Sequence, residues 1–204
     1  MHYILGLGNP GNEYENTRHN TGRMVVSHFH DISGFSLWKE DLKPKMQISQ
    51  GAISGAKTTL VLPDTFMNKS GHAAAHFIKN KKGAGNLVVL HDDLDLPLGS
   101  IKISYGRSSG GHRGVESVIK ALKTKDFVRV RIGVSPARVS RAGGSKTSKG
   151  VAKKPTGEER ILKFLLSKFT PAEMAILKKL FKNIDEALAV IVTEGHQMAM
   201  NKFN

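Results

Sequence analysis

Leu87-Val88-Val89-Leu90-His91-Asp92-Asp93-Leu94-Asp95-Leu96-Pro97 is the stretch of sequence that decides the fold. Four consecutive aliphatic residues are typical of a strand buried on both faces, as in the parallel sheets of α/β proteins. Carboxylates follow this run at once. We therefore expect them at the carboxyl edge of the sheet, where open α/β sheets bind ligands.

The segments on either side of this stretch alternate between strand-like and helix-like patterns. Helical spacing occurs around residues 22–29, 71–79 and 115–122. Such alternation predicts an α/β fold with a central sheet flanked by helices on both faces. We expect the sheet to be mixed but mostly parallel, because its last two strands are amphipathic or basic. The predicted strands are 3–7, 58–62, 87–90, 101–105 and 128–134.

The last helix is marked by its start. Thr170-Pro171-Ala172-Glu173 is a capping box with proline at the first helical position. Beyond it, apolar residues recur at three- and four-residue steps from Leu177 to Ile191, and lysines fall between them. One face of this helix should pack on the domain and a basic flank should face solvent.

The length and composition fit a single domain over residues 1–204. A chain of 204 residues can form a core without a metal or a disulfide. The absence of cysteine excludes disulfides and thiolate catalysis. No apolar run approaches the roughly 20 residues that span a bilayer, and residues 1–6 do not resemble a signal peptide. We therefore expect a soluble, cytoplasmic protein without membrane contact.

Positive charge is concentrated in the C-terminal half. The net charge is +14, of which residues 1–100 carry +1 and residues 101–204 carry +13. Such clustering favours a polyanionic partner over a surface tuned only for solubility. Residues 136–157 include six basic and no acidic side chains, and we expect a mobile basic loop there. This loop is either a flexible insertion or a contact to RNA.

The glycine-rich turn at residues 6–11 matches the dinucleotide-binding pattern G-x-G-x-x-G. That pattern requires a helix directly after the turn. Here Asn9-Pro10-Gly11-Asn12 is followed by a polar segment without apolar periodicity. We reject a nucleotide cofactor and expect the turn to direct Asn9 into a cleft.

His19 is the first candidate catalytic residue, although an isolated histidine at a helix start is more often structural. A carboxylate such as Asp92 could accept its N–H and orient it as a general base. The acids after residue 90 could instead hold Mg²⁺, but such sites usually rely on substrate phosphates as well. The glycine-rich segment 106–114 could hold a phosphate or a carbonyl, although it lacks the end of a Walker loop.

Five motifs in one order along the chain resemble those of the bacterial-type peptidyl-tRNA hydrolase family. The resemblance runs from residue 3 to about 135, is weak over 161–170 and includes the last helix. The motifs are Gly-Leu-Gly-Asn-Pro-Gly, Thr-Arg-His-Asn-Thr-Gly, Thr-Phe-Met-Asn-Lys-Ser-Gly, His-Asp-Asp-Leu-Asp-Leu-Pro and Gly-Gly-His-Arg-Gly.

The resemblance implies a monomeric α/β enzyme that needs no metal or other cofactor. Such enzymes hydrolyse the ester between a peptide, or another N-blocked aminoacyl group, and the 3′ end of tRNA. By position, the essential histidine is His19 and the acid that supports it is Asp92. The substrate-binding positions implied by the resemblance are Asn9, Tyr14, Met67 and Asn68.

Arg113 stands where the family commonly has asparagine. Its charge could bind a phosphate or repel a protonated His19, so we expect tighter RNA contact and a lowered pKa of His19. Three further basic residues lie at or beside strand positions and are candidate contacts to the tRNA backbone. They are Lys102, Arg129 and Arg131.

An alternative reading is a non-catalytic RNA-binding relative of the same fold. Arg113 favours this alternative. The joint presence of Asn9, His19, Asn68 and Asp92 favours the enzyme, because a protein that only binds RNA has no chemical need for that set.

Overall fold

The computed structural model describes residues 1–136 and 155–204. Residues 137–154 of the basic loop predicted at 136–157 therefore lie outside the described residues.

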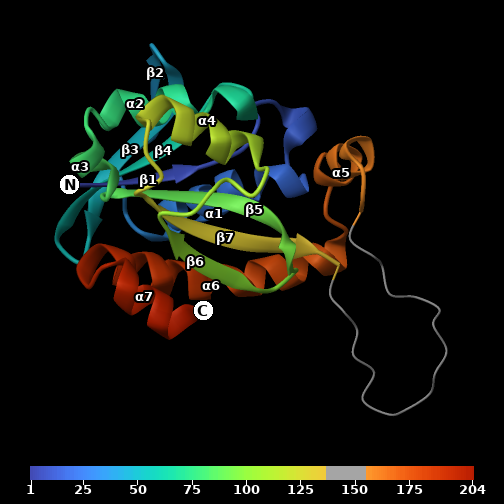
Figure 1. Cartoon of the computed structure of the whole chain (residues 1–204). Helices are drawn as coiled ribbons and strands as arrows, with labels where there is room; N and C mark the ends of the chain where they lie inside the picture. The colour runs from blue at the N-terminus through green and yellow to red at the C-terminus, as the bar shows by residue number, and fades with distance from the viewer. Residues whose placement is uncertain (137–154) are drawn as a thin grey trace.

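Within the described residues, the strands form one seven-stranded sheet of order β2-β3-β4-β1-β5-β7-β6 (Figure 1). Neighbouring strands in the run β4-β1-β5-β7 are parallel, whereas β2, β3 and β6 each join the sheet in antiparallel fashion. The strands are β1 (His2–Gly6), β2 (Lys39–Leu42), β3 (Lys45–Ile53), β4 (Ala56–Pro63), β5 (Leu87–Pro97), β6 (Ile101–Tyr105) and β7 (Val128–Ser135).

Helices cover both faces of the sheet, as Figure 1 shows for α2 and α4 on one face and α6 and α7 on the other. One buried cluster joins α1 and α6 to the sheet, and a second joins α2 and α4 to its opposite face. The helices are α1 (Thr21–Ile32), α2 (Gly71–Phe77), α3 (Lys81–Ala84), α4 (Arg113–Leu122), α5 (Glu158–Leu165), α6 (Pro171–Thr193) and α7 (His196–Phe203). Short 3-10 turns are η1 (Asn12–Tyr14), η2 (Arg18–Asn20) and η3 (Met67–Lys69).

The predicted α/β class and mixed sheet are confirmed, and so is the capping box that starts α6. The Thr170 Oγ1 accepts from the Glu173 backbone N–H at 3.3 Å, and the Thr170 N–H donates to the Glu173 carboxylate at 2.8 Å. The hairpin of β2 and β3 was not predicted, because its polar residues and Gly51 interrupt the alternation of a half-buried strand. In the part of the chain that the structure describes, no helix has both the length and the hydrophobicity for crossing a bilayer.

The strand predicted at 87–90 is longer than expected, and this extension positions the candidate site. Pairing with β1 stops at Gly6 and Leu90, whereas β5 continues beside β7 to Pro97. One edge of β5 therefore loses its neighbour just before Asp92. The start of α1 lies there, since a Cβ atom on Gly22 would be 2.1 Å from the Leu90 carbonyl oxygen. This close approach requires glycine and places η2 beside β5.

Candidate active site

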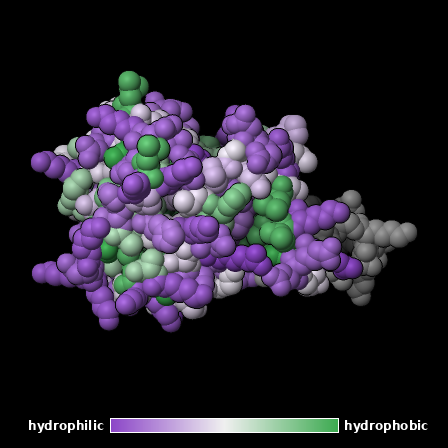
Figure 2. Space-filling model, turned by 90° about the horizontal axis from the view of Figure 1, so that it is seen from above, coloured by the Kyte–Doolittle hydropathy of each residue, from purple (hydrophilic) through white to green (hydrophobic). Residues whose placement is uncertain are grey.

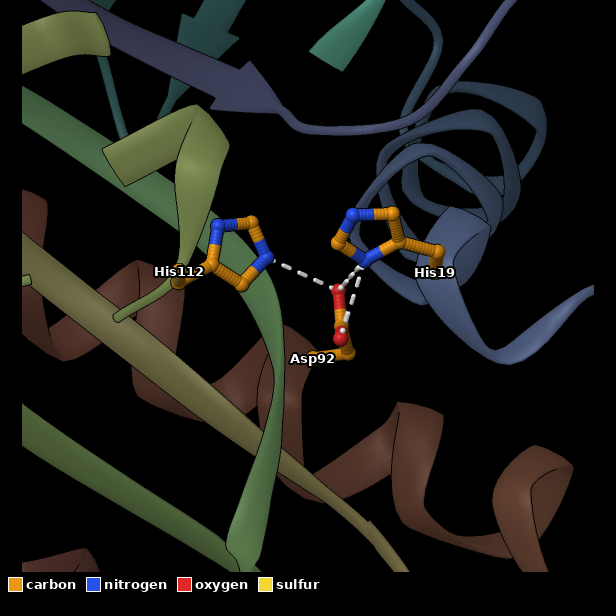
Figure 3. A group of neighbouring side chains, drawn as sticks. All are labelled: His19, Asp92 and His112. Atoms are coloured by element: carbon orange, nitrogen blue, oxygen red, sulfur yellow. Dashed lines mark hydrogen bonds and ion pairs between the residues drawn. The ribbon is translucent and has the colours of Figure 1, made fainter. Parts of the chain in front are cut away.

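Three side chains from separate elements meet at the extended end of β5 (Figure 3). The Nδ1 atom of His19, in η2, lies 2.9 and 3.1 Å from the two carboxylate oxygens of Asp92, in β5. The Nε2 atom of His112, which precedes α4, lies 2.9 Å from Oδ1 of the same carboxylate. All three side chains are buried, with exposed fractions of 8%, 2% and 8%. The result is one buried carboxylate shared between two imidazoles.

The hydrogen bonds of His112 define where its proton lies. Its Nδ1 accepts from the backbone N–H groups of Gly114 and Val115, at 3.1 and 3.3 Å, and so caps α4. Because Nδ1 accepts, Nε2 carries the proton and donates to Asp92. In His19 the N–H faces Asp92 from Nδ1, so neutral His19 has its lone pair on Nε2.

The charges of the cluster shift its pKa values in opposite directions. Burial raises the pKa of Asp92, but His19 and His112 lower it more through their charge and hydrogen bonds, so it lies well below its ordinary value. Burial lowers the pKa of His19, whereas the charge and hydrogen bond of Asp92 raise it, and the result lies above 6.5. Asp92 therefore stays ionised at neutral pH and favours a protonated His19.

The expectation that Arg113 lowers the pKa of His19 is wrong for the net value. The positive charge of Arg113 does lower this pKa, but it is the smallest of the causes and Asp92 outweighs it. Arg113 is 59% exposed, and its guanidinium pairs with the Glu158 carboxylate at the start of α5. Water screens a charge so exposed, which explains its small effect on His19.

A cavity of about 420 Å³ lies beside the cluster. His19, Asp92 and His112 line it, together with Arg113 and the glycines before α4. Its other side is apolar and is formed by Leu94 and by Ile161, Leu162 and Leu165 of α5. Figure 2 shows several hydrophobic patches among hydrophilic residues, and Leu162 of α5 is 39% exposed. The cavity thus has a polar wall and an apolar wall. We call the part of the apolar wall formed by Ile161, Leu162 and Leu165 the α5 wall.

Asn9 and Met67 form a second group next to the cluster. The side-chain oxygen of buried Asn9 accepts from the Met67 backbone N–H at 2.8 Å. The Asn9 backbone is fixed in turn by the Asn20 amide, which accepts from its N–H at 2.8 Å and donates to its carbonyl at 2.9 Å. A Cβ on Gly114 would lie 2.4 Å from the Met67 sulfur, so η3 packs directly on the start of α4.

The other predicted substrate residues lie near this group. Asn68 follows Met67 in η3 and is exposed. The half-buried Tyr14 ring is 6.4 Å from the Phe66 ring, measured between centroids. Asn9 lines a neighbouring groove rather than the cavity with His19. The structure therefore brings Asn9, Met67 and Tyr14 to the same region as the cluster but does not place them in its cavity.

The basic candidates for tRNA contact differ in exposure. Lys102 is exposed, and Arg131 is half-buried with its Nε 2.7 Å from the Asp93 carboxylate. Arg129 is only 4% exposed, and its pKa is lowered by burial and by the charge of Arg131. The burial of Arg129 does not favour it as a surface contact, because a phosphate reaches an exposed guanidinium more readily than a covered one.

Sequence reasoning missed three parts of the site: His112, His91 and the α5 wall. His112 lies within one of the motifs but has no predicted role, because histidine is not among the usual helix-capping residues. His91 is fully buried with its ring centroid 4.7 Å from that of His112, and burial lowers its pKa well below 6.5. The α5 wall was missed as well, since its apolar residues follow the basic segment without a recognisable helix start.

The spacing of the cluster would admit a metal ion, because one ligand atom each of His19, Asp92 and His112 lie within 4.8 Å of one another. The protonation of His112 argues against it. A metal at Nε2 would require the proton to move to Nδ1. There it would face the N–H groups of Gly114 and Val115, whose hydrogen bonds Nδ1 now accepts, and those bonds would be lost. The cluster fits a hydrogen-bonded triad better than a metal centre.

The fold and this cluster define an α/β enzyme with a histidine–carboxylate centre. The sequence model of the family described as peptidyl-tRNA hydrolase matches residues 3–204. The chain belongs to this family. It is therefore an enzyme of the hydrolase class, and the alternative of a non-catalytic RNA-binding protein is not supported.

Individual relatives agree with this assignment. A peptidyl-tRNA hydrolase of Carboxydothermus hydrogenoformans is 39% identical over 205 residues, covering all of this chain and 98% of that protein. One of Syntrophotalea carbinolica is 37% identical over 205 residues, covering all of this chain and 97% of that protein. The crystal structure of peptidyl-tRNA hydrolase from Acinetobacter baumannii has a TM-score of 0.83 at 30% identity, covering 99% and 93% of the two chains.

Proposed function

We propose that this enzyme hydrolyses the ester between a peptide, or another N-blocked aminoacyl group, and the 3′ end of tRNA, with His19 as the general base. The observation that carries this proposal is the pair of His19 Nδ1 and the buried Asp92 carboxylate. This pair leaves the Nε2 lone pair to take a proton from water.

The proposed reaction begins when Nε2 of His19 removes a proton from a water molecule that attacks the ester carbonyl. The imidazolium that forms is stabilised by ionised Asp92. When the tetrahedral intermediate collapses, His19 returns its proton to the departing 3′ oxygen of the tRNA. A serine nucleophile is less well supported. Ser108, within a Gly-x-Ser-x-Gly sequence, does not line the cavity, and the hydroxyl of Ser109, which does line it, accepts from the Gly111 N–H.

Asparagine amides can donate to a substrate that extends from the cavity of His19 into the neighbouring groove lined by Asn9. The Asn9 side-chain oxygen is occupied by the Met67 N–H, which orients the NH₂ group as the free donor. An amide donor adds no charge that would compete with His19. We propose that Asn9 and Asn68 bind the substrate and that Met67, Tyr14 and Arg113 contact its peptide or terminal nucleotide.

The tRNA backbone is proposed to bind at the exposed edge of the sheet. Lys102 of β6 and Arg131 of β7 are partners in register, so their side chains lie on the same face. Phosphate binding at such residues supplies sequence-independent affinity. The charge of +13 over residues 101–204 supports the same partner.

We also propose that the enzyme acts as a cytoplasmic monomer without a bound metal. The hydrogen bonds of His112 support the last point, and family resemblance supports the others.

Deacylation of an N-acetyl-aminoacyl-tRNA tests the proposal. We expect the parent protein to release free tRNA and His19→Ala to lose about 10²- to 10⁴-fold in kcat, the usual contribution of a positioned base. His72→Ala, which changes an exposed histidine of α2, is the matched control and should retain full activity. Binding of the tRNA without deacylation by the parent protein would refute the proposed reaction.

A further inference from the structure

Arg18 is a buried cation directly before His19 and outside the catalytic cavity. Its exposed fraction is 6%. Burial of a guanidinium is costly unless the charge is paired and its donors are bound. Nη2 donates to both Glu173 carboxylate oxygens at 2.7 and 2.8 Å. Nη1 donates to the Ser167 hydroxyl at 2.8 Å and to the Lys168 carbonyl at 2.9 Å.

Aromatic rings of the same region cover the guanidinium. Its central carbon lies 4.4 Å from the Phe164 ring centroid and 5.0 Å from that of Phe169. Phe164 belongs to α5, Phe169 to the link between α5 and α6, and Glu173 to the first turn of α6. One side chain therefore holds α5, the link and α6 together.

The turn that carries His19 has other attachments that do not involve the Arg18 side chain. His19 is bound to Asp92 in the sheet. The next residue, Asn20, exchanges two hydrogen bonds with the Asn9 backbone. Removal of the Arg18 guanidinium should leave these contacts in place.

Helix α5 has fewer attachments of its own. It lies at one end of the molecule in Figure 1 and buries only Leu165 in the core. Ile161 and Leu162, which line the cavity, are partly exposed. Backbone bonds also join the link after α5 to the turn of His19, from the Arg18 N–H to the Ser167 carbonyl and from the Phe169 N–H to the Asn16 carbonyl. The Arg18 side chain adds the contact that reaches α5 itself, at Phe164.

We propose that Arg18 is a positioning residue for substrate binding, because its side chain fixes the α5 wall at a set distance from His19. This inference rests on the proposed function for its kinetic consequence. Loss of the guanidinium lets α5 move without disturbing the pair of His19 and Asp92. Substrate binding is then weakened, whereas the chemical step is preserved.

The kinetic test compares Arg18→Met and Arg18→Lys with the parent protein. We expect KM for N-acetyl-aminoacyl-tRNA to rise about tenfold in both, with kcat within about twofold, the pattern of lost binding rather than lost chemistry. Lysine should not rescue, because it lacks the planar fork that binds Glu173 and stacks on the rings. Lys179→Met, which replaces an exposed cation of α6 outside the junction, is the control and should keep the parent KM.

Amide hydrogen exchange tests the same inference without any substrate. In Arg18→Met we expect exchange over residues 158–165 to be at least about tenfold faster, with residues 21–32 of α1 unchanged. Unchanged exchange in α5, or a fall in kcat with the parent KM, would overturn the inference. So would an equal rise in KM in Lys179→Met.

If Arg18→Met does not fold, Arg18→Lys and Phe164→Leu decide by the same two readouts, since each weakens the junction without leaving a large void. If the parent protein does not hydrolyse the ester, the proposed function fails, and hydrogen exchange alone still decides whether Arg18 fixes α5.

Discussion

The two walls of the cavity differ in how they are held. The polar wall consists of His19, Asp92 and His112, which come from three elements and bind one another within the body of the sheet. The α5 wall belongs to a short helix at one end of the molecule, whose only fully buried residue is Leu165 and whose Phe164 ring covers the Arg18 guanidinium. Under the proposed function, the chemical step depends on side chains that bind one another within the sheet, and substrate binding depends on a helix whose position Arg18 fixes. Defects in the two walls should have different kinetic signatures.

The largest effect should come from removing the charge at the centre of the polar wall. In Asp92→Asn we expect kcat to fall about 10³- to 10⁴-fold, because an amide NH₂ facing His19 Nδ1 would favour the tautomer with the proton on Nε2. KM should change little. Steady-state kinetics measure kcat and KM, and a thermal melt shows whether the variant is folded.

Asp93→Asn is the matched control for this prediction, since Asp93 lies on the same strand and binds Arg131 rather than a histidine. Its kcat should stay within about threefold of the parent, as expected for a residue outside the chemical step. Equal losses in the two variants would show that the charge of β5, rather than the pair with His19, supports catalysis.

An intermediate effect is expected at His112, which both caps α4 and donates to Asp92. His112→Ala loses both contacts, whereas His112→Asn retains a side-chain acceptor for the cap but cannot reach Asp92. We expect both variants to lose about tenfold in kcat, the value of one hydrogen bond to a charged group. Only His112→Ala should also lose about 1 kcal/mol of unfolding free energy, the usual contribution of a helix cap.

Denaturant unfolding and kinetics of the two His112 variants separate these roles. If His112→Asn restores kcat as well as stability, the histidine serves α4 alone and the polar wall reduces to His19 and Asp92.

The difference between the walls also explains what the sequence could predict. The apolar run at 87–90 and the capping box at Thr170 reflect local chemistry, and both were identified correctly. His19 and Asp92 were found through motifs. The role of His112 was missed, because no local pattern tells which two distant elements will share a carboxylate.

Exposure was the other quantity that the sequence could not supply. Strand alternation places Arg129 on the same face as Arg131, as the structure shows by their positions in β7. Whether that face is covered depends on the elements packed above it. Arg129 is buried, while Arg131, two residues on, remains partly accessible. A charge pattern therefore predicts a basic face but not which of its residues a phosphate can reach.

The smallest expected effect lies where the two walls meet, at the ion pair of Arg113 and Glu158. Neutral His19 is the active form, and Asp92 raises its pKa. The value of kcat/KM should therefore decline as the pH falls, and this decline should begin above pH 6.5.

The positive charge of Arg113 opposes protonation of His19. In Arg113→Asn the pKa should therefore rise further and the limb should move to higher pH. At pH 8, where the base is mostly free, loss of the pair with Glu158 should change kcat/KM less than about twofold, because an exposed pair contributes little. A larger fall at this pH would measure the proposed contact of Arg113 with the substrate. NMR titration of His19 and pH–rate profiles at low and high salt measure the shift, and salt should reduce it. A limb that does not move would show that Glu158 cancels the charge of Arg113 at the active site, leaving the pKa of His19 to the polar wall alone.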